Sequence, residues 1–174
     1  MRAQIDINRF NVTALLAFAG VAMLAGAMAF QHLGGLAPCS LCIDQRKAWA
    51  AVILLATSSA WAEGKSRVAV ALLFLALAAF AAIVGAWLAS FHVGVEQGWW
   101  AGTAACGGNL DGNGSASTAD LREQLLATPV IRCNEIAWSI IGISMAGWNG
   151  LVSFIMGLCG ITVVVRDIRR IRRA

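Results

Sequence analysis

The chain has 174 residues, of which 59% are hydrophobic and 13% are charged, and its mean hydropathy is +0.74. This composition is far more apolar than that of a soluble domain, so it excludes an ordinary soluble enzyme and indicates one small membrane domain over residues 1–174. The net charge is +4. Because most basic residues flank apolar segments, we interpret this charge as a topology signal beside anionic lipid and expect no nucleic-acid partner.

Four apolar runs are long enough to cross a bilayer, which requires roughly 20 helical residues. They cover about residues 12–30, 43–62, 68–91 and 138–165. The second run is strongly apolar only from residue 48 onward, and it reaches the required length if its helix begins near Cys42. Basic side chains at the start of that helix can extend to the interface. The sequence therefore predicts an all-α bundle of four transmembrane helices.

The basic residues predict the orientation of this bundle, because lysine and arginine near span ends are retained in the cytoplasm. Nine of the 13 basic residues flank the first and fourth runs or lie between the second and third: Arg2, Arg9, Lys65, Arg67, Arg166, Arg169, Arg170, Arg172 and Arg173. Both termini should be cytoplasmic, with loops 31–42 and 92–137 on the other side. Both loops carry paired cysteines, which suit an oxidising compartment, and for a bacterial inner membrane this is the periplasm.

A cleaved signal peptide is the competing interpretation of the first run, because small residues at positions 25–29 resemble a cleavage site. However, the apolar stretch is longer than the usual core of roughly 7–15 residues, and only two arginines precede it. We therefore expect a retained anchor.

The second outer loop is long and rich in glycine and asparagine, and loops of this length are usually functional or disordered. Residues 118–126 have the pattern of a short amphipathic helix with Thr118 as its N-cap, and this helix would rest on the membrane surface. Residues 109–120 have part of the spacing of a calcium loop, but they lack its initial Asp and final Glu. We expect no metal site there.

The first outer loop ends in P-C-S-L-C-I-D-Q-R, which contains Cys39, Cys42 and Arg46. A helix that starts here would place Cys42 at its positive N-terminal end, where a thiolate is stabilised, and Arg46 one turn further on. The guanidinium can neutralise this thiolate and donate hydrogen bonds to a ligand carbonyl. A structural disulfide and a zinc half-site are the alternatives, but zinc normally requires four ligands. We expect redox catalysis.

The second pair, Cys106 and Cys133, lies in the long loop. A disulfide between them could be a structural staple that limits the movement of the loop. Beside a C-x-x-C pair it is also a candidate relay, because thiolate–disulfide exchange transfers an oxidising equivalent through mixed disulfides. Thiols just outside a bilayer can in this way connect a soluble dithiol with a lipid-soluble electron carrier.

At these residues the whole chain resembles the DsbB family of quinone-dependent, disulfide-forming membrane oxidases. The resemblance rests on F-Q-H ahead of the C-x-x-C segment, the H-V-G-V-E segment that starts at His92, two tryptophans leading to Cys106, R-C-N-E around Cys133, and G-I-S-M-A-G-W-N in the fourth run. One departure is Gln45, where some relatives have an acidic residue. The interior of the long loop does not match closely.

The resemblance implies a role for each of these residues. Cys106 would be attacked by a reduced DsbA-like protein of thioredoxin fold, and Cys133 would leave and attack Cys39. Cys42 would then pass electrons to ubiquinone or menaquinone with the assistance of Arg46. His92 would be a second contact of the quinone.

Two other functions are kept as alternatives. A quinone oxidoreductase similar to vitamin K epoxide reductase also has four helices and two cysteine pairs, but there the loop pair typically precedes the C-x-x-C pair. A four-span scaffold with structural disulfides would need no cofactor.

Three further polar or thiol residues have weaker signals. We expect Cys159 to pack as a small apolar residue. His32 is either a hydrogen-bonding residue at the interface or a neighbour of the quinone. Asn149 lies at membrane depth, where a polar side chain serves either function or interhelical hydrogen bonding.

Overall fold

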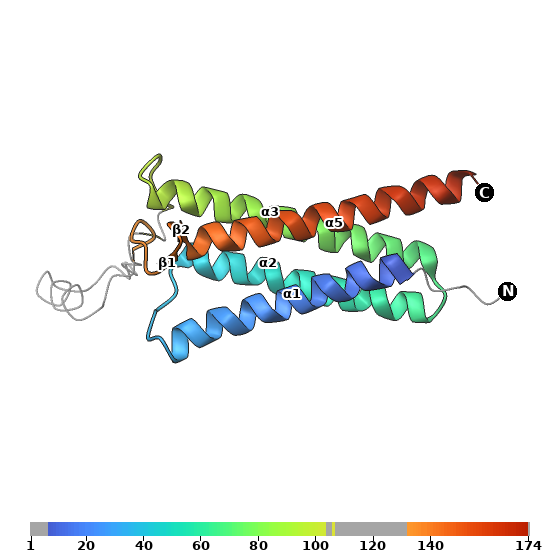
Figure 1. The fold of residues 1–174 in the computed structure, drawn as a ribbon, viewed down its shortest axis with the longest axis horizontal. Coiled ribbons are helices and arrows are strands. Elements are labelled where there is room, and N and C mark those ends of the chain that lie inside the picture. The colour runs from blue at the N-terminus through green and yellow to red at the C-terminus, as the bar shows by residue number, and fades with distance from the viewer. Residues whose placement is uncertain (1–6, 104–105, 107–131, 174) are drawn as a thin grey trace, which may run out of the picture.

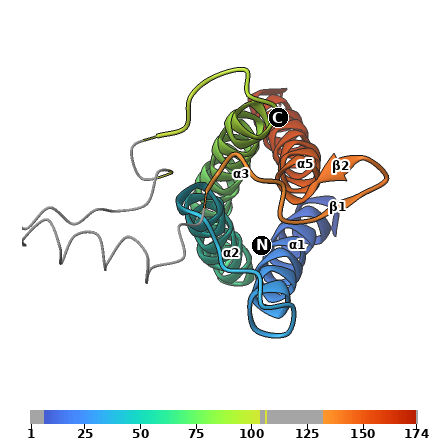
Figure 2. The same cartoon turned by 90° about the vertical axis from the view of Figure 1, so that its left-hand side faces the viewer.

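Four long helices make up most of the computed structural model, which describes residues 7–103, 106 and 132–173. They are α1 (Ile7–His32), α2 (Ser40–Gly64), α3 (Val68–Glu96) and α5 (Met145–Arg173). The helices lie side by side and alternate in direction (Figure 1). Viewed end-on, they follow one another around the bundle in the order α1, α2, α3, α5 (Figure 2). The predicted amphipathic helix at 118–126 and the segment at 109–120 lie outside the described residues.

Three of these helices, α1, α3 and α5, are long and apolar enough to cross a membrane. The helix α2 does not reach the same hydropathy, because it carries Asp44, Arg46 and Lys47 near its start and Glu63 near its end. The start of α1, the turn from α2 to α3 and the end of α5 share one end of the bundle (Figure 1). The cysteine-containing loops lie at the other end. We call these the terminal end and the cysteine end.

Small residues set the spacing between α3 and α5. A Cβ atom added at Gly157 would lie 2.5 Å from the side chain of Ile83, and one added at Gly160 would lie 2.6 Å from Ala79. At Gly160 the neighbour is the Cβ of Ala79, which cannot move aside by changing rotamer, so the close approach of the two backbones there requires glycine. At Gly157 a larger residue would have to displace the flexible Ile83 side chain. Small-residue contacts of this kind are typical of helices that pack within a membrane.

The helix α3 extends five residues beyond its predicted end at 91 and stops at Glu96. Gln97 caps it by donating its backbone N–H to the carbonyl of Val93, and Gly98 follows with a positive φ of 71°. Glycine adopts this conformation without strain and commonly ends helices. His92, which the sequence placed in the loop, is therefore held on a helix.

The fourth apolar run also differs from its prediction, because α5 begins at Met145 and not at residue 138. A hairpin precedes it, in which β1 (Ser139–Ile140) pairs with β2 (Ile143–Ser144). Ile141 and Gly142 form its turn with positive φ values of 53° and 74°, which are typical of tight hairpins. Ser144 then accepts a hydrogen bond of 3.2 Å from the backbone of Gly147 and so caps the first turn of α5.

A buried group of charges joins three helices at the terminal end. Arg9 of α1 donates hydrogen bonds of 2.9 and 3.1 Å to Glu63 of α2 and one of 3.0 Å to Asp167 of α5. All three side chains are at most 5% exposed. The cost of burying these charges is offset only while they remain paired.

The first prediction concerns this group. Replacing Arg9→Ala leaves two buried carboxylates without their shared cation, and breaking a buried pair typically costs about 3–5 kcal/mol. We expect a large fall in the denaturation midpoint of the detergent-solubilised protein. Arg67→Ala, at an exposed position of the same end, is the control and should change it little. Equal midpoints for the two variants would contradict the stabilising role of Arg9.

Candidate active site

Cys39 and Cys42 lie where the first outer loop enters α2. Cys39 is the N-cap of this helix, and its sulfur accepts a hydrogen bond of 3.3 Å from the backbone N–H of Cys42. The two sulfurs are unbonded, lie 2.9 Å apart and share a hydrogen bond. Both therefore lie at the helix N-terminus, where the partial positive charge favours a thiolate. The expected position of Cys42 at a helix start is confirmed.

Cys106 and Cys133 form a disulfide, with their Cα atoms 5.2 Å apart. The hydroxyl of Ser40 lies 3.5 Å from the sulfur of Cys106 and 3.6 Å from that of Cys133. Cys39 belongs to the same packed cluster as this disulfide. The structure therefore brings the two predicted cysteine pairs together, with one serine of α2 beside both.

The segment after α3 folds back over that helix and leads toward Cys106. The indole of Trp100 donates a hydrogen bond of 3.0 Å to the carbonyl of Phe91, and the two rings stack with centroids 5.8 Å apart. A Cβ atom at Gly94 would lie 2.0 Å from Trp100, so this close approach requires glycine. The glycine of H-V-G-V-E thus has a packing function that the sequence did not reveal.

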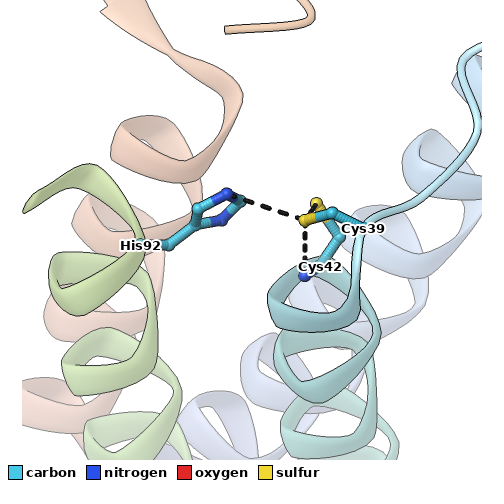
Figure 3. Close-up of side chains that lie close together, drawn as sticks. All are labelled: Cys39, Cys42 and His92. Carbon is cyan, nitrogen blue, oxygen red and sulfur yellow. Dashed lines mark hydrogen bonds between the residues drawn. The ribbon is translucent and has the colours of Figure 1, made fainter. Parts of the chain in front are cut away.

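His92 is buried and faces the first cysteine pair (Figure 3). Its Nε2 lies 3.7 Å from the sulfur of Cys39, and its Nδ1 lies 2.9 Å from the side-chain nitrogen of Gln45. Glu96, one turn further along α3, places a carboxylate oxygen 3.9 Å from Nε2. The sequence predicted a quinone contact for His92, and the structure adds a direct contact with Cys39.

A cavity of about 280 Å³ lies beside the first pair, between α1, α2, the start of α5 and the segment around residue 135. Its polar lining includes Cys39, Cys42, Arg46, His92 and Glu96. The rest is largely apolar and aromatic, with Met23, Ala27, Phe30, Trp49, Trp138 and Trp148. A mostly apolar cavity with a few converging polar groups is typical of a small-molecule site.

Arg46 is held at this cavity by α1. Its guanidinium donates hydrogen bonds of 2.5 Å to the side-chain oxygen of Gln31 and 3.2 Å to the carbonyl of Ala27. The same group lines the cavity together with Cys42. The sequence predicted that Arg46 and Cys42 share a face but did not identify Gln31, the glutamine of F-Q-H, as the residue that orients the guanidinium.

A second hollow, of about 360 Å³, lies on the loop side of the disulfide. Val95, Trp100, Thr103 and Asn134 line it together with Cys106 and Cys133. Cys106 is 8% exposed and Cys133 is 1% exposed. Cys106 is therefore the more exposed of the two disulfide residues.

Charge in the reduced first pair is distributed unequally. The hydrogen bond from the Cys42 thiol, together with His92, lowers the pKa of Cys39 to about 4, although burial opposes this shift. The same sulfur–sulfur hydrogen bond, together with burial, raises the pKa of Cys42, while the charge of Arg46 acts in the opposite direction. In the dithiol form the thiolate therefore belongs to Cys39. The Cys42 thiolate predicted from the sequence belongs to a different state, in which Cys39 has formed a disulfide with another cysteine and no longer accepts a hydrogen bond from Cys42.

The sulfurs of Cys39 and Cys42 and a ring nitrogen of His92 all lie within 4.8 Å of one another, close enough to ligate one metal ion. This set is one ligand short of a closed structural zinc site. The sequence analysis kept a zinc half-site at the two cysteines as an alternative, and the structure places His92 beside them as a third possible ligand.

Three other residues singled out from the sequence have simpler positions. Asn149 makes interhelical hydrogen bonds to Gln45 and Trp49. Cys159 is a half-buried free thiol in α5, and His32 is exposed at the end of α1.

Residues 9–163 match the sequence profile of the family described as "Disulfide bond formation protein DsbB". The chain belongs to the DsbB family. It is 31% identical over 173 residues to "Disulfide bond formation protein B" of Verminephrobacter eiseniae, covering 97% of this chain and 93% of that protein. The proteins of the same name from a Polaromonas species and Herminiimonas arsenicoxydans are 32% and 33% identical, covering 92% and 86% of this chain and 93% and 90% of their own. No solved structure matches the chain significantly.

Membership of the DsbB family agrees with the helical membrane architecture and assigns the chain to disulfide formation. Besides Gln31, two contributors to the site were not predicted as such from the sequence. Gln45 was noted only as a departure from some relatives, and Glu96 only as the last letter of a motif. The spacing of four residues between His92 and Glu96 could have indicated that both lie on one helical face.

The second prediction tests the Cys39 thiolate, in protein whose other thiols, Cys106, Cys133 and Cys159, are replaced by alanine. Because the folded pKa is lowered, the thiolate is present above this pKa and is lost as the pH falls through about 4. The ultraviolet absorbance of the reduced pair should show this midpoint. Adding Cys42→Ala removes the main stabilising hydrogen bond and should move the midpoint upward, toward the ordinary value of about 8.5. A midpoint near that value while Cys42 is present would contradict the assignment.

Proposed function

We propose that the protein reoxidises a DsbA-like periplasmic dithiol carrier of thioredoxin fold and passes the electrons to a membrane quinone. The observation that carries this proposal is the position of the cysteines, which occupy one packed cluster between two hollows. The loop-side hollow reaches the disulfide, and the cavity beside α1 reaches the C-x-x-C pair. A soluble substrate and a lipid-soluble one can thus be used at opposite faces of one thiol relay.

The exchange starts at the disulfide. A carrier thiolate attacks the sulfur of Cys106, a bond forms between the two, and the Cys106–Cys133 bond breaks with its electron pair on Cys133. The greater exposure of Cys106 supports this direction. Cys133 then attacks Cys39 of the oxidised first pair and releases Cys42 as a thiolate. Ser40, which contacts both loop sulfurs, is placed to donate a hydrogen bond to the thiolate that forms.

The residues around the larger cavity fit a quinone headgroup. Apolar and aromatic side chains can cover its ring, and Arg46 can donate to a carbonyl oxygen while its charge favours a thiolate on Cys42. A bound ubiquinone or menaquinone would accept two electrons and two protons there. Arg46, Cys42 and His92 are the residues that we propose to contact it.

We also propose that α2 is the fourth membrane span and that the cysteine end faces the periplasm of a bacterial inner membrane, with both termini cytoplasmic. The 25 residues of α2 extend about 37 Å at a rise of 1.5 Å per residue, which is enough to cross the hydrocarbon core. Three candidate spans surround or adjoin it, and its charged residues lie near its ends. The excess of basic residues at the terminal end supports this orientation.

The third prediction tests the role of Arg46 in quinone use. We expect Arg46→Ala to lower the rate of quinone reduction by roughly tenfold or more, because a charge-assisted hydrogen bond and a nearby cation are lost. Arg46→Lys keeps the charge without the planar fork and should be intermediate. Lys47→Ala is the matched control, since Lys47 is an exposed neighbour paired with Asp44. Unchanged quinone kinetics in Arg46→Ala would remove this role, whereas a native protein that reduces no quinone would favour the scaffold.

The fourth prediction tests the order of transfer. A carrier that lacks its own resolving cysteine should remain attached to Cys106 as a mixed disulfide on a non-reducing gel. Cys106→Ser should abolish this adduct, and Cys159→Ser should leave it unchanged. Cys133→Ala, which leaves Cys106 without a disulfide, should also abolish it. An adduct on Cys39 instead would reverse the roles of the two pairs.

A further inference from the structure

A continuous chain of hydrogen bonds runs through the bundle to the first cysteine pair. The indole N–H of Trp49 donates to the side-chain oxygen of Asn149 at 2.6 Å. The amide nitrogen of Asn149 donates to the side-chain oxygen of Gln45. The amide nitrogen of Gln45 lies 2.9 Å from Nδ1 of His92, and Nε2 of His92 lies 3.7 Å from the sulfur of Cys39.

The direction of this chain is determined at its first member. An indole N–H can only donate, so the oxygen of Asn149 must face Trp49 and its NH₂ group must face Gln45. The oxygen of Gln45 must then face Asn149, and its NH₂ group must face His92. Reversing either amide would bring two donors together. All four side chains are buried, so a donor that faces another donor is left without its partner at a cost in free energy.

We propose that this relay holds His92 in its neutral Nε2–H form, with the N–H directed at Cys39. A donor from Gln45 requires Nδ1 to be an acceptor, which leaves the ring proton on Nε2. The groups around Nε2 favour a proton on that nitrogen. They are the sulfur of Cys39, the Glu96 carboxylate at 3.9 Å and the backbone of Cys133, and each of them can accept a hydrogen bond. Although burial lowers the pKa of His92, these groups together raise it, and it is the Gln45 donor at Nδ1 that keeps a second proton off the ring.

Glu96 is held in place by an element outside the relay. The hydroxyl of Ser144 donates to its second oxygen at 2.5 Å. The ring is thus bounded by the donor of Gln45 on one side and by acceptors on the other. Gln45 is neutral, and the only carboxylate facing the ring among the described residues is that of Glu96.

The part that this histidine tautomer plays in the reaction rests on the proposed function. The second thiol of the carrier first attacks the carrier sulfur bonded to Cys106, so the carrier leaves as a disulfide and the electron pair of the broken bond stays on Cys106. The Cys106 thiolate then attacks Cys133 of the Cys39–Cys133 disulfide. The Cys106–Cys133 bond forms, the Cys39–Cys133 bond breaks, and its electron pair stays on Cys39. A donor at Nε2 of His92 stabilises that departing thiolate. Gln45, Asn149 and Trp49 are then positioning residues, because they act through His92 and do not touch the reacting sulfur.

The relay can be tested by nitrogen-15 NMR of histidine-labelled protein, since a ring nitrogen without a proton resonates well downfield of one that carries a proton. The chain has only two histidines, and a His32→Gln background leaves the signal of His92 alone. We expect a bare Nδ1 and a protonated Nε2. Asn149→Asp should reverse Gln45, because a carboxylate cannot donate to it, and the Nδ1 signal should shift upfield as this nitrogen gains a proton.

Asn149 does not touch His92, so a merely structural role would not cause this shift. The spectra of Asn149→Asp are recorded at a pH at which the carbon-13 resonance of the introduced carboxyl group shows that this group is ionised. Asn149→Leu also removes the donor to Gln45 and replaces the acidic variant if that one fails to fold. In Asn149→Leu we expect an additional population with a protonated Nδ1. Gln97→Glu makes an equivalent amide-to-acid change at an exposed position of the same end and should leave the His92 signals unchanged.

A protonated Nδ1 in the native protein would overturn the proposal. An unprotonated Nδ1 in Asn149→Asp, with the introduced carboxyl group ionised, would also overturn it. An equal shift in Gln97→Glu would also overturn it, because the effect would then be one of added charge alone. The measurement needs neither carrier nor quinone. Failure of the relay would therefore leave the oxidase proposal intact, and loss of quinone reduction in the native protein would leave the relay result standing.

Discussion

Polar groups buried within an apolar helix bundle must find their hydrogen-bond partners inside the bundle, because neither lipid nor apolar side chains can supply them. This constraint determines both ends of the structure. At the terminal end, Arg9 is paired with Glu63 and Asp167 from two other helices. At the cysteine end, Gln45 and Asn149 are paired with each other and with His92 and Trp49. In both places the pairing selects one arrangement of the helices.

The same constraint allows the C-x-x-C pair to hold a thiolate without being exposed. Cys39 is nearly buried, yet the helix N-terminus, the Cys42 thiol and His92 all favour a negative charge on its sulfur. A thiolate in an apolar site without these donors would be strongly disfavoured. The pair can therefore lie against an apolar cavity and still hold a thiolate, as the proposed transfer of electrons to a lipid-soluble acceptor requires.

The two cysteine pairs have different surroundings, and these differences divide the proposed chemistry between them. The disulfide lies beside a hollow on the loop side, whereas the C-x-x-C pair lies at the N-terminus of α2, beside a cavity bounded by α1 and α5. Ser40 lies beside both loop sulfurs. Exchange between the pairs requires movement over a short distance only, because Cys39 and the disulfide already belong to one packed cluster.

The sequence by itself determined the helical segments, the two cysteine pairs and the position of Arg46 one turn after Cys42. These features depend on composition and on spacing along one helix, which local periodicity reports directly. It misplaced the end of α3 and the start of α5, because both depend on turns with positive φ at Gly98, Ile141 and Gly142. Only the tertiary structure decided which polar side chains meet at the site. Asn149 is separated from Gln45 by 104 residues and from Trp49 by 100, and their contact depends on how helix faces pack against one another, which no spacing within a single helix can specify.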